Sequence, residues 1–128
     1  MDRKIVAIAG VLGAIGIILG AFGAHSLKEL LAPEQLAVFE TGVRYQMYHA
    51  LFLLFVGMTP MVSQKAKRLI LGLVLSGVLF FSFSIYFLAC KSLFSVDVTI
   101  IGPVTPIGGL LLIAAWVVLI LNIMRRKG

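Results

Sequence analysis

The residues that could do chemistry gather in one stretch of the sequence, between His25 and Ala50. This stretch holds both histidines, three of the five acidic residues, Arg44 and two of the three tyrosines. Imidazole, carboxylate and guanidinium groups are the ones that proton paths, metal sites and ion pairs use. The candidate polar site consists of His25, Glu40, Arg44, Tyr45, Gln46 and His49.

The spacing within this stretch is helical. Glu40 and Arg44 are four residues apart, with the acid on the N-terminal side, so on a helix they face one another in the better orientation. We expect Arg44, rather than Lys28, to be the chief cation contact of Glu40, because its planar fork fits a carboxylate better than an ammonium does. Tyr45 and His49 are also four apart.

A single helix is predicted to carry most of this site. Pro33 suits a first helical position, and Glu34 suits the positive end of the helix dipole. An apolar stripe follows at helical spacing, formed by Leu36, Phe39, Val43 and Met47. The sequence therefore predicts a helix that begins near Pro33 and runs past His49 into the membrane.

Several uses of the polar site are open. We expect His25 and His49 to lie on one polar side of the bundle, within reach of Glu40, Tyr45 or Gln46, because a polar group in lipid needs a partner. The favoured interpretation is that these groups only bind one another. A proton or solute path through His49 and Glu40 comes next. A metal or haem site on the two histidines has thinner support.

Composition places the chain in a membrane. Of its 128 residues, 61% are hydrophobic and 12% are charged, whereas about a quarter is usual for soluble domains. The net charge of +6 comes from basic residues at the ends of apolar runs, which indicates orientation in a bilayer and not nucleic-acid binding. The single cysteine, Cys90, excludes an intrachain disulfide and a multi-cysteine metal site. No cofactor is expected.

Four apolar segments are long enough to cross a hydrocarbon core, which takes about 20 residues. Because water is absent there, each must be a helix. The first is longer than a signal-peptide core of about 7–15 residues, so it is interpreted as a retained span. The predicted fold is an all-α membrane protein, a single domain over 1–128 with four transmembrane helices in a compact bundle. The predicted spans are Ile5–Ala24 and, approximately, Tyr45–Val62, Leu69–Cys90 and Pro106–Met124.

The connections predict the orientation. Basic clusters precede the first span, join the second to the third, and follow the fourth. They all fall on one side if both termini are cytoplasmic, in a multi-pass protein of the cell (inner) membrane. Ser26–Ala32, between the first two spans, is predicted to be a short amphipathic segment with Leu27, Leu30 and Leu31 on one side. The connection Lys91–Thr105 is predicted to be irregular or short extended.

Small residues predict close helix packing. Gly13, Gly16 and Gly20 recur every three or four residues in the first span, and Gly108 with Gly109 opens the fourth. Such faces allow helix backbones to approach, within one chain or between subunits. Trp116 falls near mid-span, which favours a packing role.

Serines in the third span could bond back to their own helix. Ser82 and Tyr86 share a helical face and Ser84 does not, and bonds to the same helix are the favoured interpretation for buried serines.

Several motifs, taken together and in order, resemble a known family. They are Gly20-Ala21-Phe22-Gly23-Ala24-His25, Phe39-Glu40-Thr41, Arg44-Tyr45-Gln46, Tyr48-His49-Ala50, Ser82-x-Ser84-x-Tyr86 and Thr105-Pro106-Ile107-Gly108-Gly109 with Trp116. The chain resembles, over nearly its whole length, the bacterial membrane family called domain of unknown function 423, and is similar to eukaryotic transmembrane protein 256. The resemblance implies a small polytopic inner-membrane protein and implies no activity.

Two functions are consistent with these observations. The first is a structural or accessory membrane protein that acts through helix packing, with the lipid bilayer around it and a homo-oligomer or a larger membrane complex as partner. The alternative is a small transporter or channel-like protein with a polar site near the outer face, formed by His25, Glu40, Arg44 and His49. An enzyme is disfavoured, because no nucleophile has an adjacent base in the sequence.

Overall fold

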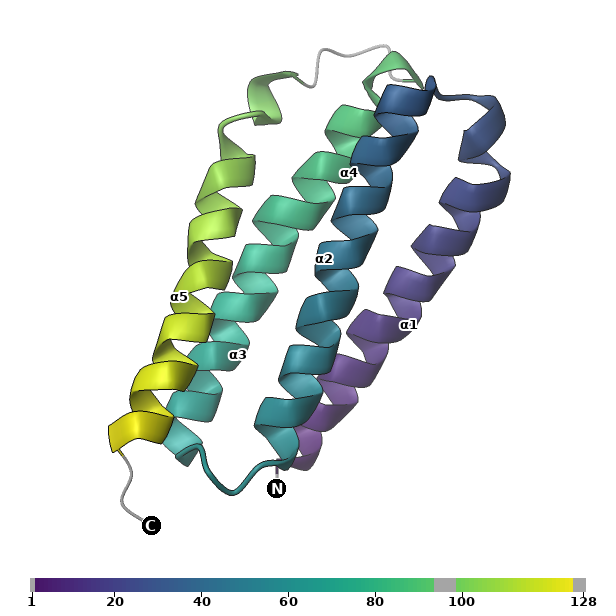
Figure 1. The fold of residues 1–128 in the computed structure, drawn as a ribbon. Helices are drawn as coiled ribbons and strands as arrows, with labels where there is room; N and C mark the ends of the chain where they lie inside the picture. Colours follow the sequence, from purple (N-terminus) through teal and green to yellow (C-terminus); the bar gives the residue numbers. More distant parts are fainter. Residues whose placement is uncertain (1, 94–98, 126–128) are drawn as a thin grey trace.

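The structure, a computed structural model, describes residues 2–93 and 99–125, and helices are the only regular elements among them. Figure 1 shows the long helices lying side by side, with both termini at one end of the bundle. The predicted all-α bundle is confirmed. In chain order its elements are α1 (Arg3–His25), η1 (Leu27–Glu29), α2 (Pro33–Met58), α3 (Gln64–Val78), η2 (Leu79–Phe83), α4 (Ser84–Ala89), η3 (Lys91–Leu93), η4 (Thr99–Ile101) and α5 (Val104–Arg125).

Three stretches of the described chain are long and apolar enough to cross a membrane. They are Arg3–Glu29, Gln64–Ala89 and Val104–Arg125. Helix α2 has 26 residues but is not among them, because charged and polar residues interrupt its first half. A crossing by α2 therefore stays a prediction.

The bounds of α2 follow from two prolines. Pro33 is its first residue, after an extended Ala32, as the sequence predicts. The helix ends at Met58, and Thr59 is extended at φ −81° and ψ 138°, because a residue before proline avoids the helical region. The predicted extension of this span to Val62 is therefore wrong.

The third apolar stretch is one helical path with an irregular centre. Helix α3 begins after Ser63, whose hydroxyl accepts from the N–H of Ala66, and its path passes through the π-helical turn η2 into α4. A π turn holds an extra residue and is common at sites that matter for packing or function. Here it lies beside α2 and α5.

The two connections at the far end are short helical turns where they are described. In η1 and after it, Leu27 and Leu31 are buried while Lys28 and Glu29 are exposed, which fits the predicted amphipathic segment. Leu30, predicted to lie on the same side as Leu27 and Leu31, is exposed while those two are buried. Of the connection predicted to be irregular or extended, η3 and η4 are 3₁₀ turns, and residues 94–98 lie outside the described chain.

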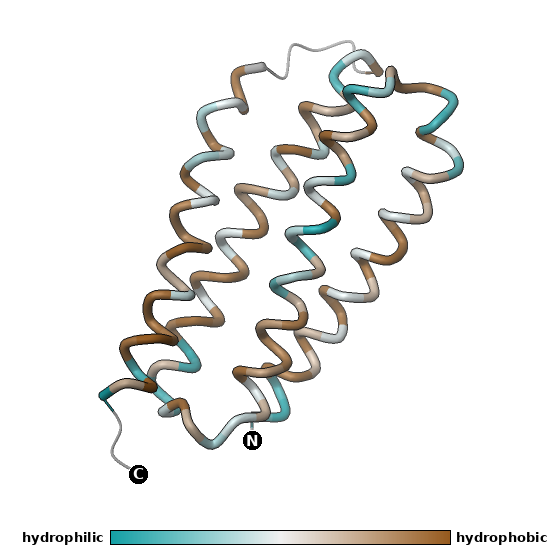
Figure 2. Tube along the Cα trace, viewed as in Figure 1, coloured by the Kyte–Doolittle hydropathy of each residue, from teal (hydrophilic) through white to brown (hydrophobic). Residues whose placement is uncertain are grey.

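Helix α2 occupies the middle of the bundle. It packs antiparallel on α1, with Gly13 beside Ala50 and Gly20 beside Val43, and on its other side it contacts α3, η2 and α4. Helix α5 packs on α3 and η2. Figure 2 shows hydrophilic positions along α2 at levels where α5 is hydrophobic. The central helix therefore carries polar groups, and its neighbours bury two of them, Gln46 and His49.

Candidate functional site

His49 is buried between α2 and α5, and both of its ring nitrogens are engaged. Its Nδ1 lies 2.7 Å from the backbone oxygen of Tyr45, and the indole Nε1 of Trp116 donates to its Nε2 across 3.1 Å. A carbonyl oxygen only accepts and an indole N–H only donates. The proton of the imidazole must therefore sit on Nδ1, and the ring is neutral with no free nitrogen.

Gln46 forms a second, separate polar contact within the bundle. It is fully buried. Its Nε2 donates to the backbone oxygen of Leu12 in α1 across 3.0 Å, and its Oε1 accepts from the Tyr86 hydroxyl of α4 across 2.6 Å. Three helices are thus joined by one amide side chain. Hydrogen bonds of this kind satisfy groups for which lipid offers no partner.

The serines of the third stretch extend this pattern. Ser82 donates to the backbone oxygen of Gly42 in α2 across 2.9 Å, so the favoured bond to its own helix is wrong for this residue. Ser84 does bond to its own helix, at the oxygen of Phe80, and also meets the hydroxyl of Thr105 at 2.6 Å. Ser82 and Tyr86 contact α2 whereas Ser84 faces α5, as the helical spacing predicts.

Four of the six predicted site residues lie on the surface. His25, Glu40, Arg44 and Tyr45 are exposed. Arg44 donates to the Thr41 hydroxyl across 3.1 Å, and among the described residues it forms no ion pair with Glu40. Arg44 therefore bonds to Thr41, one turn away on the same helix, in place of the expected ion pair with Glu40. Exposed charges are hydrated, so such a pair would gain little free energy.

The structure does not bring the two histidines together. His25 ends α1 at the end of the bundle where α2 begins. His49 lies 16 residues into α2 from Pro33, roughly 24 Å along the axis at 1.5 Å per residue. The residues expected on one polar side are therefore divided. Gln46 and His49 form two separate buried contacts, and the other predicted site residues are exposed. Nor does any cluster of three His, Cys, Asp or Glu side chains suited to a metal occur in the described chain.

A cavity of about 350 Å³ adjoins His49. Its walls are mostly apolar and come from α2, η2 and α5, and Ile113 and Trp116 on its lining are partly exposed on the bundle surface. The lining residues are Tyr45, His49, Phe81, Gly109, Leu112, Ile113 and Trp116. This space can hold an apolar group, but it offers no charged residue to an ion.

The glycines singled out in the first span face α2 of the same chain. A Cβ added to Gly16 would lie 2.6 Å from the Met47 sulfur, and one added to Gly20 would lie 3.4 Å from a Val43 methyl. At Gly13 the nearest atom, the Ala50 Cβ, would be at an ordinary 3.6 Å. The closest approach is therefore at Gly16.

The glycine pair of α5 differs between its members. A Cβ on Gly108 would lie 2.6 Å from the Phe80 carbonyl carbon and 2.8 Å from the Gly77 oxygen, both backbone atoms. On Gly109 the nearest atom would be a Phe81 ring carbon at 3.6 Å. Gly108 is thus the position where α5 and η2 meet backbone to backbone.

One polar feature at the end with the termini, the buried Lys67, was not singled out from the sequence. Lys67 is only 3% exposed, and its Nζ lies 3.4 Å from the Gly57 oxygen, which also accepts from the backbone N–H of Asp2. A cation there suits the negative end of the α2 dipole. Lys67 belongs to a basic cluster of three in the sequence. Only its position around the α3 helix, which turns it inward, distinguishes it from Lys65 and Arg68.

Comparisons with known proteins agree on one family. The family profile described as "Protein of unknown function (DUF423)" matches residues 19–109. A UPF0382 membrane protein of Staphylococcus epidermidis is 37% identical over 126 residues, covering 98% of this chain and 99% of the relative. One from Haemophilus influenzae is 33% identical over 127 residues, covering 99% and 98%. The UPF0382 membrane protein YwdK of Bacillus subtilis is 35% identical over 120 residues, covering 91% and 94%. No solved structure matches the chain.

Proposed function

The chain belongs to the DUF423 family of membrane proteins, and from that premise we propose that it is an accessory protein of the cell membrane. In this proposal its function is to pack against another transmembrane helix, from a second copy or from a larger complex, and not to move a solute. The helix bundle provides the packing surface, and its buried polar side chains stabilise the bundle.

The observation that carries this proposal is the engagement of His49. A histidine in a proton path must release one nitrogen and accept a proton on the other. Both nitrogens of His49 are already bonded, to Tyr45 and to Trp116. Among the described residues no buried side-chain nitrogen or oxygen lacks a partner. This arrangement supports a fixed structural role for the polar groups.

Small exposed residues on the outer face of α1 support the proposal that a partner helix packs there. Gly10 is exposed, and a Cβ added there would meet nothing within 4 Å. Ala7 and Ala14 are exposed on the neighbouring turns, and Ala21 is exposed two turns beyond Ala14. Small residues three and four apart let a second helix approach closely, which is how helices associate where lipid supplies no hydrophobic drive.

The proposal includes four crossings with both termini in the cytoplasm. The two termini lie at one end of the bundle (Figure 1), and basic residues gather there, as cytoplasmic ends prefer. For α2, the burial of Gln46 and His49 inside the bundle favours a crossing. Reporter fusions near residue 65 and at the C-terminus should read cytoplasmic, and one near residue 30 external. A C-terminus found outside contradicts this orientation.

The two faces of α1 allow a direct test of the packing proposal. Gly10→Leu and Ala14→Leu should weaken the assembly, measured by crosslinking in membranes and native mass spectrometry, with the unfolding temperature unchanged. Gly16→Leu should instead destabilise the bundle itself, because its side chain would meet Met47. Ile17→Leu, which conserves volume at an exposed site, is the control. Assemblies of unchanged size in both outer-face variants would contradict the proposal.

The cavity beside His49 is the one observation that favours a transport function. We therefore expect purified protein in proteoliposomes to show no proton flux above empty vesicles under an imposed potential. His49→Phe should leave that result unchanged. A flux that appears with the native protein and disappears in this variant would replace the accessory role with a transport role.

A further inference from the structure

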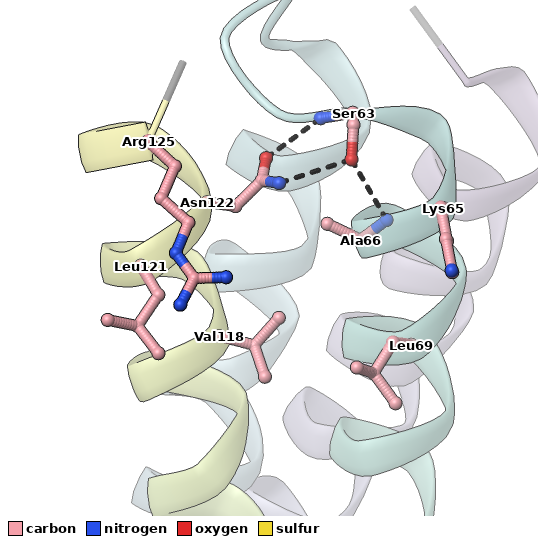
Figure 3. A pocket seen from close by; sticks show the side chains of 8 residues that line it. All are labelled: Ser63, Lys65, Ala66, Leu69, Val118, Leu121, Asn122 and Arg125. Atoms are coloured by element: carbon pink, nitrogen blue, oxygen red, sulfur yellow. Dashed lines mark hydrogen bonds between the residues drawn. The ribbon is translucent and has the colours of Figure 1, made fainter.

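A groove between α3 and α5 opens at the end of the bundle where the termini lie (Figure 3). Its volume is about 320 Å³. The residues that line it are Ser63, Lys65, Ala66, Leu69, Val118, Leu121, Asn122 and Arg125. Polar and charged side chains occupy the outer level and aliphatic side chains the inner level, so the groove is amphipathic along its length.

Two cations flank the mouth of the groove. In Figure 3, Lys65 extends from α3 and Arg125 from α5, on opposite walls. Both are exposed, and neither forms an ion pair with a described residue. The nearby acid Asp2 is engaged with Gln64 and with backbone N–H groups of α1. The rim therefore presents positive charge without an internal counterion.

A polar contact joins the two walls at the outer end of the groove. The Asn122 amide accepts from the Ser63 N–H at 2.9 Å and donates to the Ser63 hydroxyl at 3.2 Å. These bonds join the start of α3 to the last turns of α5, as Figure 3 shows. They fix the spacing of the two walls, so the groove is preformed.

The inner level of the groove is aliphatic and exposed on the bundle surface. Leu69 is 53% exposed and Leu121 is 47% exposed, and both lie on helical stretches long and apolar enough to span a bilayer. Together with Val118 they form an aliphatic wall that continues toward the middle of the membrane.

We propose that this groove binds one anionic phospholipid. The phosphate lies between Arg125 and Lys65, where a guanidinium can form two parallel bonds to its oxygens, and an acyl chain lies on Leu69, Val118 and Leu121. Basic pockets between membrane helices bind acidic headgroups in this manner. A free phosphate would use only the rim, so the aliphatic wall selects the lipid.

The experiment uses the full-length protein, delipidated in a mild non-ionic detergent. Phosphatidylglycerol, phosphatidylcholine of the same chain length, glycerophosphoglycerol and inorganic phosphate are each titrated, and bound lipid is counted by native mass spectrometry. Phosphatidylglycerol should bind in one-to-one stoichiometry and lose affinity with added salt. Phosphatidylcholine binding equally well, or displacement of the lipid by either chain-free compound at equal concentration, overturns the proposal.

Four variants distinguish binding in the groove from an effect of general positive charge. Lys65→Gln and Arg125→Gln should each weaken binding about fivefold, and the double variant about 25-fold, since a cation near an anionic headgroup contributes a factor of that order. Arg68→Gln changes the same charge on an exposed residue outside the groove and should leave binding unchanged. Unfolding temperatures measured without lipid verify that each variant is folded. An equal loss in Arg68→Gln would reduce the effect to net charge and overturn the site.

Discussion

Trp116 of α5 donates its indole N–H to Nε2 of His49 in α2 across 3.1 Å, and the Phe52 ring packs edge-on against the indole at 4.1 Å between centroids. The bond fixes the imidazole as a neutral ring with its proton on Nδ1, pointing at the Tyr45 carbonyl oxygen. A histidine that would otherwise suggest a proton path therefore serves to join two helices.

The tautomer of His49 is directly measurable. Nitrogen-15 spectra of histidine-labelled protein in detergent at neutral pH should show one ring in the Nδ1–H form. The exposed His25 provides the second signal, and His25→Asn assigns it. Trp116→Phe keeps the ring packing but removes the donor, so the Nε2 of His49 should become free to bind water and stability should fall by about 1 kcal/mol. A native His49 that is protonated on Nε2 contradicts the geometry.

Gly108 and Gly109 form a matched pair for testing helix packing. Gly108→Ala should destabilise the bundle by about 1–3 kcal/mol, because its Cβ would press on backbone atoms of Phe80 and Gly77. Gly109→Ala should be neutral or stabilising by up to about 1 kcal/mol, because alanine is the better helix former and its nearest contact is ordinary. Chemical denaturation in detergent measures both. Equal effects would show that α5 can shift to accommodate either methyl group.

The sequence predicted the helices well because their signals are local. Long apolar runs need no partner to be recognised, and Pro33 marks the start of α2 within the chain itself. The amphipathic segment is also local, although Leu30, which follows η1, is exposed while Leu27 and Leu31 are buried. Helical spacing also predicted that Ser82 and Tyr86 share a face and that Ser84 does not, but not that this face contacts α2.

The contacts of the site could not be predicted, because they depend on how helices rotate against one another. His49 and Trp116 are 67 residues apart, and the local sequence around either residue does not indicate that the other is its partner. Four-residue spacing permitted an ion pair between Glu40 and Arg44, but spacing does not report solvent exposure, and both side chains are exposed. The sequence thus identified Gln46 and His49 as candidate site residues, but only the structure shows which groups they bond to.

The bond between Gln46 and Tyr86 should couple α2 to α4 energetically. Tyr86→Phe leaves the buried Oε1 of Gln46 without its donor, and Gln46→Leu leaves the Tyr86 hydroxyl without its acceptor, so each should cost about 1–3 kcal/mol. The double variant should cost less than the sum, because neither group is then left unpaired. Tyr48→Phe, at an exposed hydroxyl on the same helix as Gln46, is the control. Strict additivity in this cycle would show that the two side chains act independently.

The last prediction concerns acid stability at the start of α1. The Ile5 backbone N–H, with the Gln64 side chain, holds the pKa of the Asp2 carboxyl below its ordinary value of 3.8. Because the folded pKa is the lower one, the stabilising contribution is complete above pH 3.8 and is lost as the pH falls through the folded pKa.

This pH dependence should disappear when the carboxylate is removed. In Asp2→Asn the side-chain oxygen can still cap Lys4 and Ile5, so α1 should form, but the unfolding temperature should fall slightly at neutral pH and should no longer depend on this group below pH 3.8. Thermal unfolding of native and variant protein across that range, at fixed salt and detergent, makes the comparison. Glu29→Gln, an exposed acid at the opposite end of the bundle, controls for net charge. Parallel curves for native protein and Asp2→Asn would place the acid-sensitive group elsewhere.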